Sequence, residues 1–204
     1  PATPGEAYTY TVSAVAPDDR VGPPSRKVGI IASTEPLTPM LQLSFKDESF
    51  LAGLASLADK GLALGGKGWA QLPAQSEWDT GSDLTLSVWA KLDDVKGMPV
   101  LICKGAWQQA GYFVQILNGQ VRFYLAGVDT LDAGQIEPGK WQHIVATFGS
   151  GEMRIYLNGQ LAGRKSVTGH PRASNEPLLI GRYGLNDETY FVRGVMDDVR
   201  IYDV

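Results

Sequence analysis

Residues 140–161 read KWQHIVATFGSGEMRIYLNGQL, and this stretch indicates the fold class. Within residues 141–148 and 153–157, apolar side chains alternate with polar ones, which is the pattern of strands with one buried face. The second run ends in Asn158-Gly159, a dipeptide that accepts positive φ at both central positions of a tight hairpin. The stretch therefore predicts consecutive strands over residues 141–148, 153–157 and 160–163.

A second Asn-Gly dipeptide, Asn118-Gly119, joins two more apolar runs in the same way. The candidate strands are residues 40–45, 62–64, 70–72, 84–92, 100–104, 112–117, 120–125, 141–148, 153–157, 160–163, 178–180 and 195–202. Many short strands separated by Gly and Pro predict an all-β fold, a two-sheet antiparallel sandwich. Residues 50–57 look helical, but the segment is short and glycines follow it, so we expect a loop or a single turn there.

The composition is that of a globular protein, with 204 residues of which 44% are hydrophobic and 20% charged. A net charge of −4 gives no field that attracts phosphate backbones, so we expect no nucleic-acid partner. No apolar run reaches the roughly 18 residues of a membrane span, and we expect no membrane partner. No leader opens the sequence, so a secreted protein would carry its signal upstream. The only cysteine, Cys103, lies in an apolar run and is interpreted as a buried, inert thiol.

The first 39 residues differ from the rest. Residues 7–15 read AYTYTVSAV and alternate at period two, and a second strand begins near residue 27. Between them lies a loop with Pro23-Pro24-Ser25. The two strands predict an N-terminal β-hairpin over residues 1–35, a Pro-bearing linker over residues 36–39 and the main domain over residues 40–204.

Four segments of the main domain, taken in order, resemble laminin-G-like domains of the concanavalin A-like jelly-roll class. They are residues 84–91 (LTLSVWAK), 140–159, 178–182 (LLIGR) and 193–202 (RGVMDDVRIY). The resemblance implies a jelly-roll sandwich over residues 40–204. The N-terminal hairpin is similar to the last two strands of a fibronectin type III module, which implies that the rest of such a module lies upstream.

Catalytic patterns are missing from the sequence. Glycanases of this fold place two carboxylates on alternate positions of one strand, and no such pattern is present. Asp197 and Asp198 are adjacent, so strand alternation would send them to opposite faces. His143 lies within a strand and His170 in a polar loop, and we interpret the first as structural and the second as solvated. We therefore expect a protein that is not an enzyme.

Candidate ligand-binding residues combine aromatic rings, which cover the apolar faces of sugars, with planar donors for the hydroxyls. Residues 104–112 hold Trp107, Gln109 and Tyr112 outside a clear apolar pattern. In residues 121–125, alternation places Arg122 and Tyr124 on the face opposite to three apolar side chains. Arg182 and Tyr183 follow a strand end. Each of these residues could equally be an ordinary exposed residue, and their joint occurrence is what favours a binding site.

Calcium enters only through the resemblance, which implies a structural Ca²⁺ near the first and last strands. Asp197 occupies the position of a ligand in the last strand, and Asp47 follows the first strand. However, residues 49–54 read SFLAGL, which is apolar where the family has acidic residues. Two roles for Asp197 therefore stay open: it holds calcium, or it caps neighbouring backbone amides.

These observations favour a non-catalytic carbohydrate-binding or adhesion module of a larger extracellular protein, with a polysaccharide or glycoconjugate as partner and neighbouring domains of the same polypeptide as further partners. The first alternative is a structural or protein-interaction module without affinity for glycans. The second is a glycanase or polysaccharide lyase with an unrecognised site. Because one fold carries all three functions, the residues of the site have to decide between them.

Overall fold

The structure is a computed structural model. It describes residues 38–204, except 47–48, 59–60, 80 and 185–186, and the backbone of two strands at residues 7–10 and 28–31. The described part is all-β, with two single-turn 3₁₀ helices. The 3₁₀ helices are η1 (Ser76–Trp78) and η2 (Glu188–Tyr190). The strands are β1 (Ala7–Tyr10), β2 (Val28–Ile31), β3 (Leu41–Leu43), β4 (Leu51–Gly53), β5 (Ser56–Ala58), β6 (Gly61–Gly65), β7 (Gly68–Leu72), β8 (Leu84–Leu92), β9 (Val100–Ala106), β10 (Ala110–Leu117), β11 (Gln120–Leu125), β12 (Asp129–Gln135), β13 (Gln142–Gly149), β14 (Glu152–Leu157), β15 (Gln160–Ser166), β16 (Leu178–Ile180) and β17 (Arg193–Tyr202).

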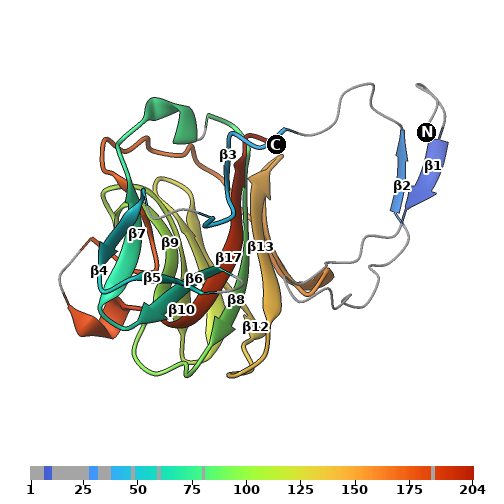
Figure 1. Cartoon of the computed structure of the whole chain (residues 1–204). Helices are drawn as coiled ribbons and strands as arrows, with labels where there is room; N and C mark the ends of the chain where they lie inside the picture. Colours follow the sequence, from blue (N-terminus) through green and yellow to red (C-terminus); the bar gives the residue numbers. More distant parts are fainter. Residues whose placement is uncertain are drawn as a thin grey trace.

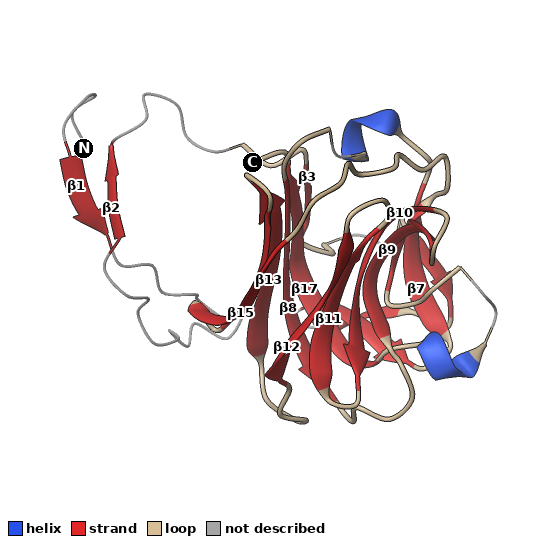
Figure 2. Ribbon diagram, turned by 180° about the vertical axis from the view of Figure 1, so that it is seen from behind, coloured by secondary structure: helices blue, strands red, loops and turns tan. Residues whose placement is uncertain are grey.

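Two antiparallel sheets form a sandwich (Figure 1). The seven-stranded sheet has the order β12-β11-β10-β9-β16-β7-β4. The eight-stranded sheet runs β15-β14-β13-β8-β17-β6-β5, with β3 paired to β17 beside β6. Figure 2 shows the two layers from behind, with β13, β8 and β17 in one and β9, β10 and β11 in the other. The predicted all-β, two-sheet antiparallel jelly-roll fold is confirmed.

Alternate side chains of each sheet fill the space between the layers. Val121, Phe123 and Leu125 of β11 are buried against the inner face of the other sheet, and Leu84, Leu86 and Val88 of β8 are buried in the same cluster. Burying one such side chain contributes about 1.5–3 kcal/mol before the entropy of folding is subtracted. The period-two pattern of the sequence is thus the origin of the core.

Both predicted Asn-Gly hairpins are confirmed. Asn118 and Gly119 have φ of 52° and 80°, and Asn158 and Gly159 have φ of 52° and 77°. Positive φ at both central positions is the geometry that twists with the flanking strands. Asn158 adds a second contact, since its Oδ1 accepts a hydrogen bond of 2.9 Å from the backbone N–H of His143.

Three strands were not predicted. Residues 50–57, expected as a loop or a single turn, contain β4 and the start of β5, which pair with β7 and β6. Strand β12 reads DTLDAGQ and buries only Leu131 and Ala133 of its seven residues. Its register is set by the ladder to β11, a contact that the local sequence does not signal.

The N-terminal strands β1 and β2 pair antiparallel, with Ala7 opposite Ile31 and Tyr10 opposite Val28. The predicted hairpin is confirmed for these residues. Its loop at residues 11–27 and the first part of the linker lie outside the described residues. Its origin in a fibronectin type III module and the domain boundary at residues 36–39 stay predictions.

No helix in the described part of the chain is long and apolar enough to cross a membrane.

Candidate functional site

A second, smaller apolar cluster covers the outer face of the seven-stranded sheet. It contains buried side chains of β9, β10, β11 and β16, among them Cys103, Phe113 and Tyr124. Trp107 lies over this cluster, with its ring centroid 4.5 Å from that of Tyr124 and 6.0 Å from that of Phe113. Tyr183 packs edge-on against Phe113 at 5.9 Å. We call Trp107, Phe113, Tyr124 and Tyr183 the outer aromatic cluster.

Two phenols of this cluster hold the turn between β9 and β10. The Tyr183 hydroxyl accepts a hydrogen bond of 2.6 Å from the backbone N–H of Trp107. The Tyr124 hydroxyl accepts one of 2.7 Å from the next backbone N–H, that of Gln108. Gln108 has a φ of 59°, a costly conformation that the two hydrogen bonds help to hold. The turn is therefore fixed to the sheet, with 41% of Trp107 exposed at its apex.

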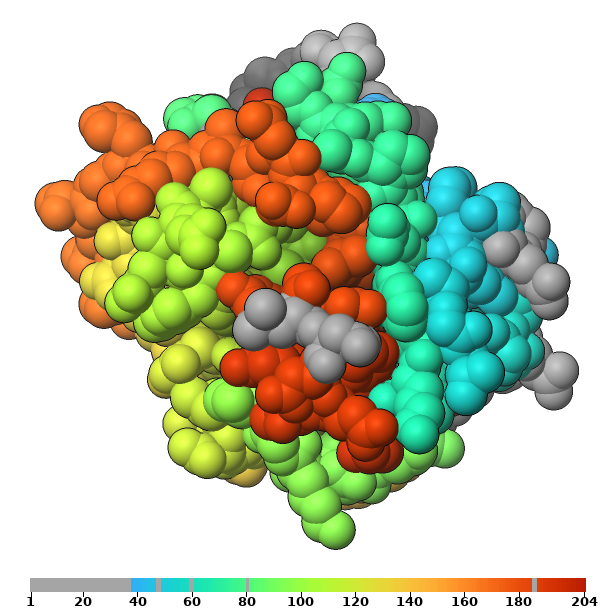
Figure 3. Space-filling model, turned by 90° about the vertical axis from the view of Figure 1, so that its left-hand side faces the viewer, coloured from blue at the N-terminus to red at the C-terminus, as the bar shows by residue number. Residues whose placement is uncertain are grey.

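A hollow of about 410 Å³, the first hollow, lies on one side of this turn. It is lined by residues of four segments: Gln71, Gly105, Ala106, Gln109, Glu176, Pro177, Leu179, Arg182, Tyr183 and Gly184. On the face shown in Figure 3, the yellow-green segment with β9 and β10 borders the orange segment with β16. The volume is typical of small-molecule sites, and the lining mixes apolar surface with amide, carboxylate and guanidinium groups.

A second hollow of about 400 Å³ lies on the other side of the turn. It is lined by Trp107, Gln108, Tyr124, Leu125, residues 127–130 and Arg172. The turn that carries Trp107 thus separates two hollows that both open on the outer face of the seven-stranded sheet. An extended chain of sugars could contact both hollows and the Trp107 ring between them.

Most of the predicted binding residues come together here. Trp107 and Gln109 are exposed on the turn, and Arg182 and Tyr183 line the first hollow. Arg122 faces outward as predicted, but both ends of its guanidinium donate to the Asp132 carboxylate at 2.7 Å. That ion pair raises the pKa of Arg122 and fixes its guanidinium carbon 6.0 Å from the centre of the Trp107 ring.

Tyr112 and Tyr124 require correction. Tyr112 is 1% exposed in the main core, and its hydroxyl donates to the Trp78 carbonyl oxygen at 2.9 Å, so no ligand can reach it. Tyr124 faces outward as predicted but is only 6% exposed, because Trp107 and Phe113 cover its ring. Tyr124 therefore supports the turn and offers little surface of its own.

Three residues in or beside the first hollow were not among the predicted binding residues. They are Trp69, Gln71 and Glu176. Trp69 and Gln71 are two positions apart on β7, both face outward, and the Trp69 Nε1–H donates to Gln71 Oε1 at 3.3 Å. Alternation in residues 68–72 was the available signal. Glu176 lies in a loop far along the chain, and only the fold brings it to β7.

The metal prediction rests on Asp197, because Asp47 lies outside the described residues. Burial raises the pKa of Asp197, with a partial offset from a hydrogen bond donated by the Asp198 backbone N–H. Its Oδ1 atom is buried and has no hydrogen-bond partner among the described residues. A buried carboxylate oxygen that accepts no hydrogen bond is a suitable ligand for a hard cation. The Asp197 carboxylate therefore fits Ca²⁺. No cluster of three His, Cys, Asp or Glu side chains occurs within the described residues.

Asp197 and Asp198 do not follow simple alternation, which corrects the reasoning from the sequence. The ladder between β17 and β8 shifts register between Asp197 and Arg200, and Asp198 has a φ of 47°. Asp198 Oδ1 accepts hydrogen bonds from Arg200 Nε at 2.7 Å and from Gln42 Nε2 at 3.2 Å. Because both partners are side chains of the same sheet, we assign Asp198 a structural role.

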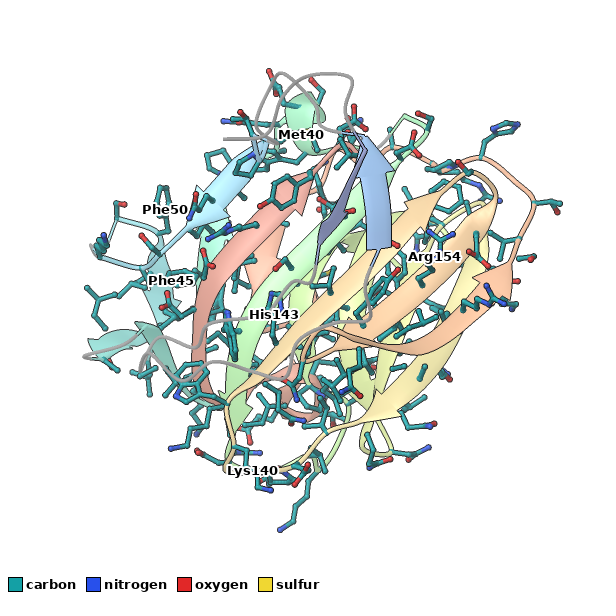
Figure 4. The ribbon with its side chains drawn as sticks, turned by 90° about the vertical axis from the view of Figure 1, so that its right-hand side faces the viewer. Met40, Phe45, Phe50, Lys140, His143 and Arg154 are labelled. Carbon is teal, nitrogen blue, oxygen red and sulfur yellow. The ribbon has the colours of Figure 1, made fainter. Side chains whose placement is uncertain are left out.

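His143 lies on the outer face of the other, eight-stranded sheet, near its middle in Figure 4. Its ring stacks on Trp89 at 5.0 Å, and its Nε2 lies 2.8 Å from Ser87 Oγ. Burial lowers the pKa of His143 to about 4, so the ring is neutral at pH 7. Cys103 is 1% exposed, which confirms that the thiol is buried, and this burial raises its pKa to about 12. That the thiol is inert stays a prediction.

Solved structures with similar folds have low sequence identity. Domain 4 of AbnA, an extracellular arabinanase of Geobacillus stearothermophilus in complex with arabinotriose, has a TM-score of 0.63 and 16% identity, over 82% of this chain and 93% of that chain. The binding domain of botulinum neurotoxin serotype D/C has a TM-score of 0.67 and 14% identity, over 81% of this chain and 48% of that one. Domains LG4-5 of the mouse laminin alpha1 chain have a TM-score of 0.58 and 21% identity, over 71% of this chain and 41% of the laminin chain.

The chain thus spans nearly all of the arabinanase domain and less than half of the toxin and laminin chains. At these identities the likeness shows a shared fold. No curated protein matches the chain significantly. Residues 64–204 match the sequence model of the family described as the concanavalin A-like lectin/glucanases superfamily. With that match over more than half of its length and the sandwich described above, the chain belongs to the concanavalin A-like lectin/glucanases superfamily.

Proposed function

We propose that the domain binds polysaccharide without catalysis, as one module of a larger extracellular protein. The observation that carries the proposal is the turn of residues 106–109. Two tyrosine hydroxyls fix it between two hollows, and it presents the Trp107 ring to solvent. A ring held in advance loses little conformational entropy when a sugar stacks on it. The surrounding Gln71, Gln109, Glu176 and Arg182 side chains supply donors and acceptors for hydroxyl groups.

Two similar folds support the proposal, since one is a domain solved with arabinotriose and another is described as a binding domain. The protein-interaction alternative predicts a continuous apolar patch. In the described part, the large exposed apolar side chains are Leu54, Trp107, Leu161 and Val204, which lie on separate segments. This scatter favours a glycan over an apolar protein surface.

Affinity electrophoresis tests the proposal, with arabinan, galactan, xylan and polygalacturonate each cast into a native gel. We expect at least one polymer to retard the wild type and Trp107→Ala to lose about 2 kcal/mol, roughly 30-fold in affinity. The matched control is Leu161→Ala, because Leu161 is 50% exposed on β15 and lies outside both hollows. Unretarded migration of the wild type in every gel would refute glycan binding among these polymers and favour the protein-interaction module. Release of reducing ends from any polymer would show an enzyme.

We also propose that Asp197 holds a structural Ca²⁺, with Asp47 as a second ligand. The supporting observation is the buried Oδ1 of Asp197, which lacks a donor among the described residues. Calcium that binds only the folded state would stabilise it by about 2.7 kcal/mol at one hundred times its Kd. Melting curves with 1 mM CaCl₂ and with EGTA should differ for the wild type and coincide for Asp197→Asn. If Asp197 instead caps backbone amides, calcium will not shift the wild-type melting temperature.

A further inference from the structure

The guanidinium of Arg182 is held rigidly at the edge of the first hollow. Its central carbon lies 4.3 Å from the centre of the Trp69 ring and 5.1 Å from that of Phe191. Those two rings meet edge to face at 6.0 Å, and the Trp69 ring is itself anchored by its hydrogen bond to Gln71. Arg182 therefore has a fixed position before any ligand arrives.

Backbone carbonyls occupy one edge of this guanidinium. Nε donates to the Tyr183 carbonyl oxygen at 2.8 Å, and Nη2 donates to the Gly184 carbonyl oxygen at 3.3 Å. A guanidinium carries five N–H donors, so three remain without an acceptor among the described residues, two on Nη1 and one on the outer side of Nη2. These remaining donors form the end-on fork, which matches the two oxygens of a carboxylate.

No carboxylate pairs with Arg182 among the residues that the structure describes. Four other arginines, Arg122, Arg154, Arg164 and Arg200, each pair with an aspartate or glutamate. Burial lowers the pKa of Arg182, because desolvation penalises its positive charge. A fixed, partly desolvated cation whose fork is free favours an anionic ligand group over a neutral hydroxyl.

We propose that the first hollow receives the carboxylate of an acidic sugar, with the free fork of Arg182 as its bidentate partner. The inference rests on the proposed glycan-binding function and names its substrate class. Uronic acids and sialic acids both present such a carboxylate beside a ring that can contact Tyr183 and Gln109. The neighbouring Tyr183 and Arg182 lie on one strand-end segment, so one ligand ring can contact both side chains.

Two negative features of the protein oppose the binding of an acidic sugar. Glu176 also lines the first hollow and is exposed, so it would accept hydrogen bonds from hydroxyls and would weakly repel an acidic sugar. The whole chain has a net charge of −4, so its long-range field disfavours polyanions. Binding of an acidic polymer would therefore require a local cationic site and could not be attributed to general attraction.

The test compares polygalacturonate with the same polymer after full methyl esterification, which removes the charge and keeps the backbone. A second comparison, for sialic acids, sets sialyllactose against lactose, the same sugar without the sialic acid. Arabinan and galactan are neutral references. Isothermal titration calorimetry is run on the full chain and on four variants, one of which is a control. Arg182→Gln removes the charge and the fork, Arg182→Lys keeps the charge alone, and Glu176→Gln removes the opposing charge. Arg154→Gln, on the opposite sheet (Figure 4), is the matched loss of one arginine.

We expect either polygalacturonate or sialyllactose to bind at least tenfold more tightly than its uncharged form. Arg182→Gln should lower the affinity for this acidic probe about 10- to 100-fold, as expected when a charge-assisted pair of hydrogen bonds is lost. Arg182→Lys should show most of the same loss of affinity. Glu176→Gln should bind slightly more tightly and Arg154→Gln like the wild type, with melting curves confirming that each variant is folded. Equal binding of charged and uncharged forms, or wild-type affinity of a folded Arg182→Gln, would overturn the inference and leave glycan binding intact. Binding of none of the acidic or neutral probes would overturn the inference and count against glycan binding itself.

Discussion

Replacement of Asp79 by asparagine should destabilise the domain far more than a loop substitution normally does. Asp79 follows η1, and its Oδ1 accepts a hydrogen bond of 2.7 Å from the Nζ of Lys104 on β9. The Lys104 side chain is 0% exposed, and that of Asp79 is 12% exposed. Lys104 Nζ also donates to the Ser174 carbonyl oxygen, and Ser174 N donates to Asp79 Oδ1 at 3.0 Å. One carboxylate thus joins η1, a sheet strand and the loop before β16.

The magnitude follows from the burial of the ammonium group. Removing one partner of a buried ion pair costs about 3–5 kcal/mol, because the other charge stays buried without compensation. In the variant, the Lys104 ammonium still has two acceptors, the amide oxygen of the new asparagine and the Ser174 carbonyl oxygen. We therefore expect a loss at the low end of this range, about 3 kcal/mol. For a domain of this size that corresponds to a fall of roughly 6–12 °C in melting temperature.

Urea denaturation followed by tryptophan fluorescence measures the loss, since Trp78 is buried directly beside Asp79. The control is the double variant Asp79→Asn, Lys104→Met, which removes the buried charge and should regain part of the lost stability. The reasoning would be refuted by an Asp79→Asn variant within 0.5 kcal/mol of the wild type, a difference about as small as that of a surface substitution. A double variant that is less stable than Asp79→Asn alone would also contradict it.

Three further predictions concern other sites. The pKa of His143 is about 4 when folded and near its ordinary value of 6.5 when unfolded, so the unfolded chain binds the proton more readily between these pH values. Stability should therefore fall as pH drops from 6.5 to 4, by up to about 3 kcal/mol, and His143→Gln should flatten this part of a pH–stability curve. Cys103, whose thiol pKa is raised to about 12, should not react with a disulfide reagent at pH 8 until the protein is unfolded in urea, and a rapid reaction of the native protein would show that the thiol is accessible. Because burial raises the pKa of Asp197, Asp197→Asn should melt higher than the wild type in EGTA, and a lower melting temperature would point to a capping role for the carboxylate.

The local sequence predicted what depends on near neighbours. Alternation in residues 120–125 placed Phe123 inward and Arg122 outward, and the Asn-Gly pairs located two hairpins. Residues 112–117 read YFVQIL, in which the only strongly polar side chain is that of Gln115, so the alternation signal is weak. Tyr112 could therefore not be assigned to a face from its sequence, and it proved to be in the core.

The candidate site depends on strand order, which the local sequence does not encode. Strand β16 pairs with both β7 and β9, which brings Arg182 beside Trp69 and across the hollow from Gln109. Each of these side chains comes from a different segment. The burial of Tyr124 has the same origin, because it is covered by Trp107 from a neighbouring turn. Composition identified the residue types of the site, and the fold decided which of them meet.

The central claim, that glycans bind the outer face of the seven-stranded sheet, is tested most directly by the tryptophan indole N–H signals in a two-dimensional NMR spectrum. The chain has five tryptophans, so each indole is a separate reporter. On titration with tetragalacturonate, and with arabinotriose as a neutral counterpart, we expect the Trp107 signal to move most and Trp69 to follow. Trp89 and Trp141, clustered on the other sheet, should stay unchanged. Shifts centred on Trp89 and Trp141 with Trp107 unmoved would contradict the account.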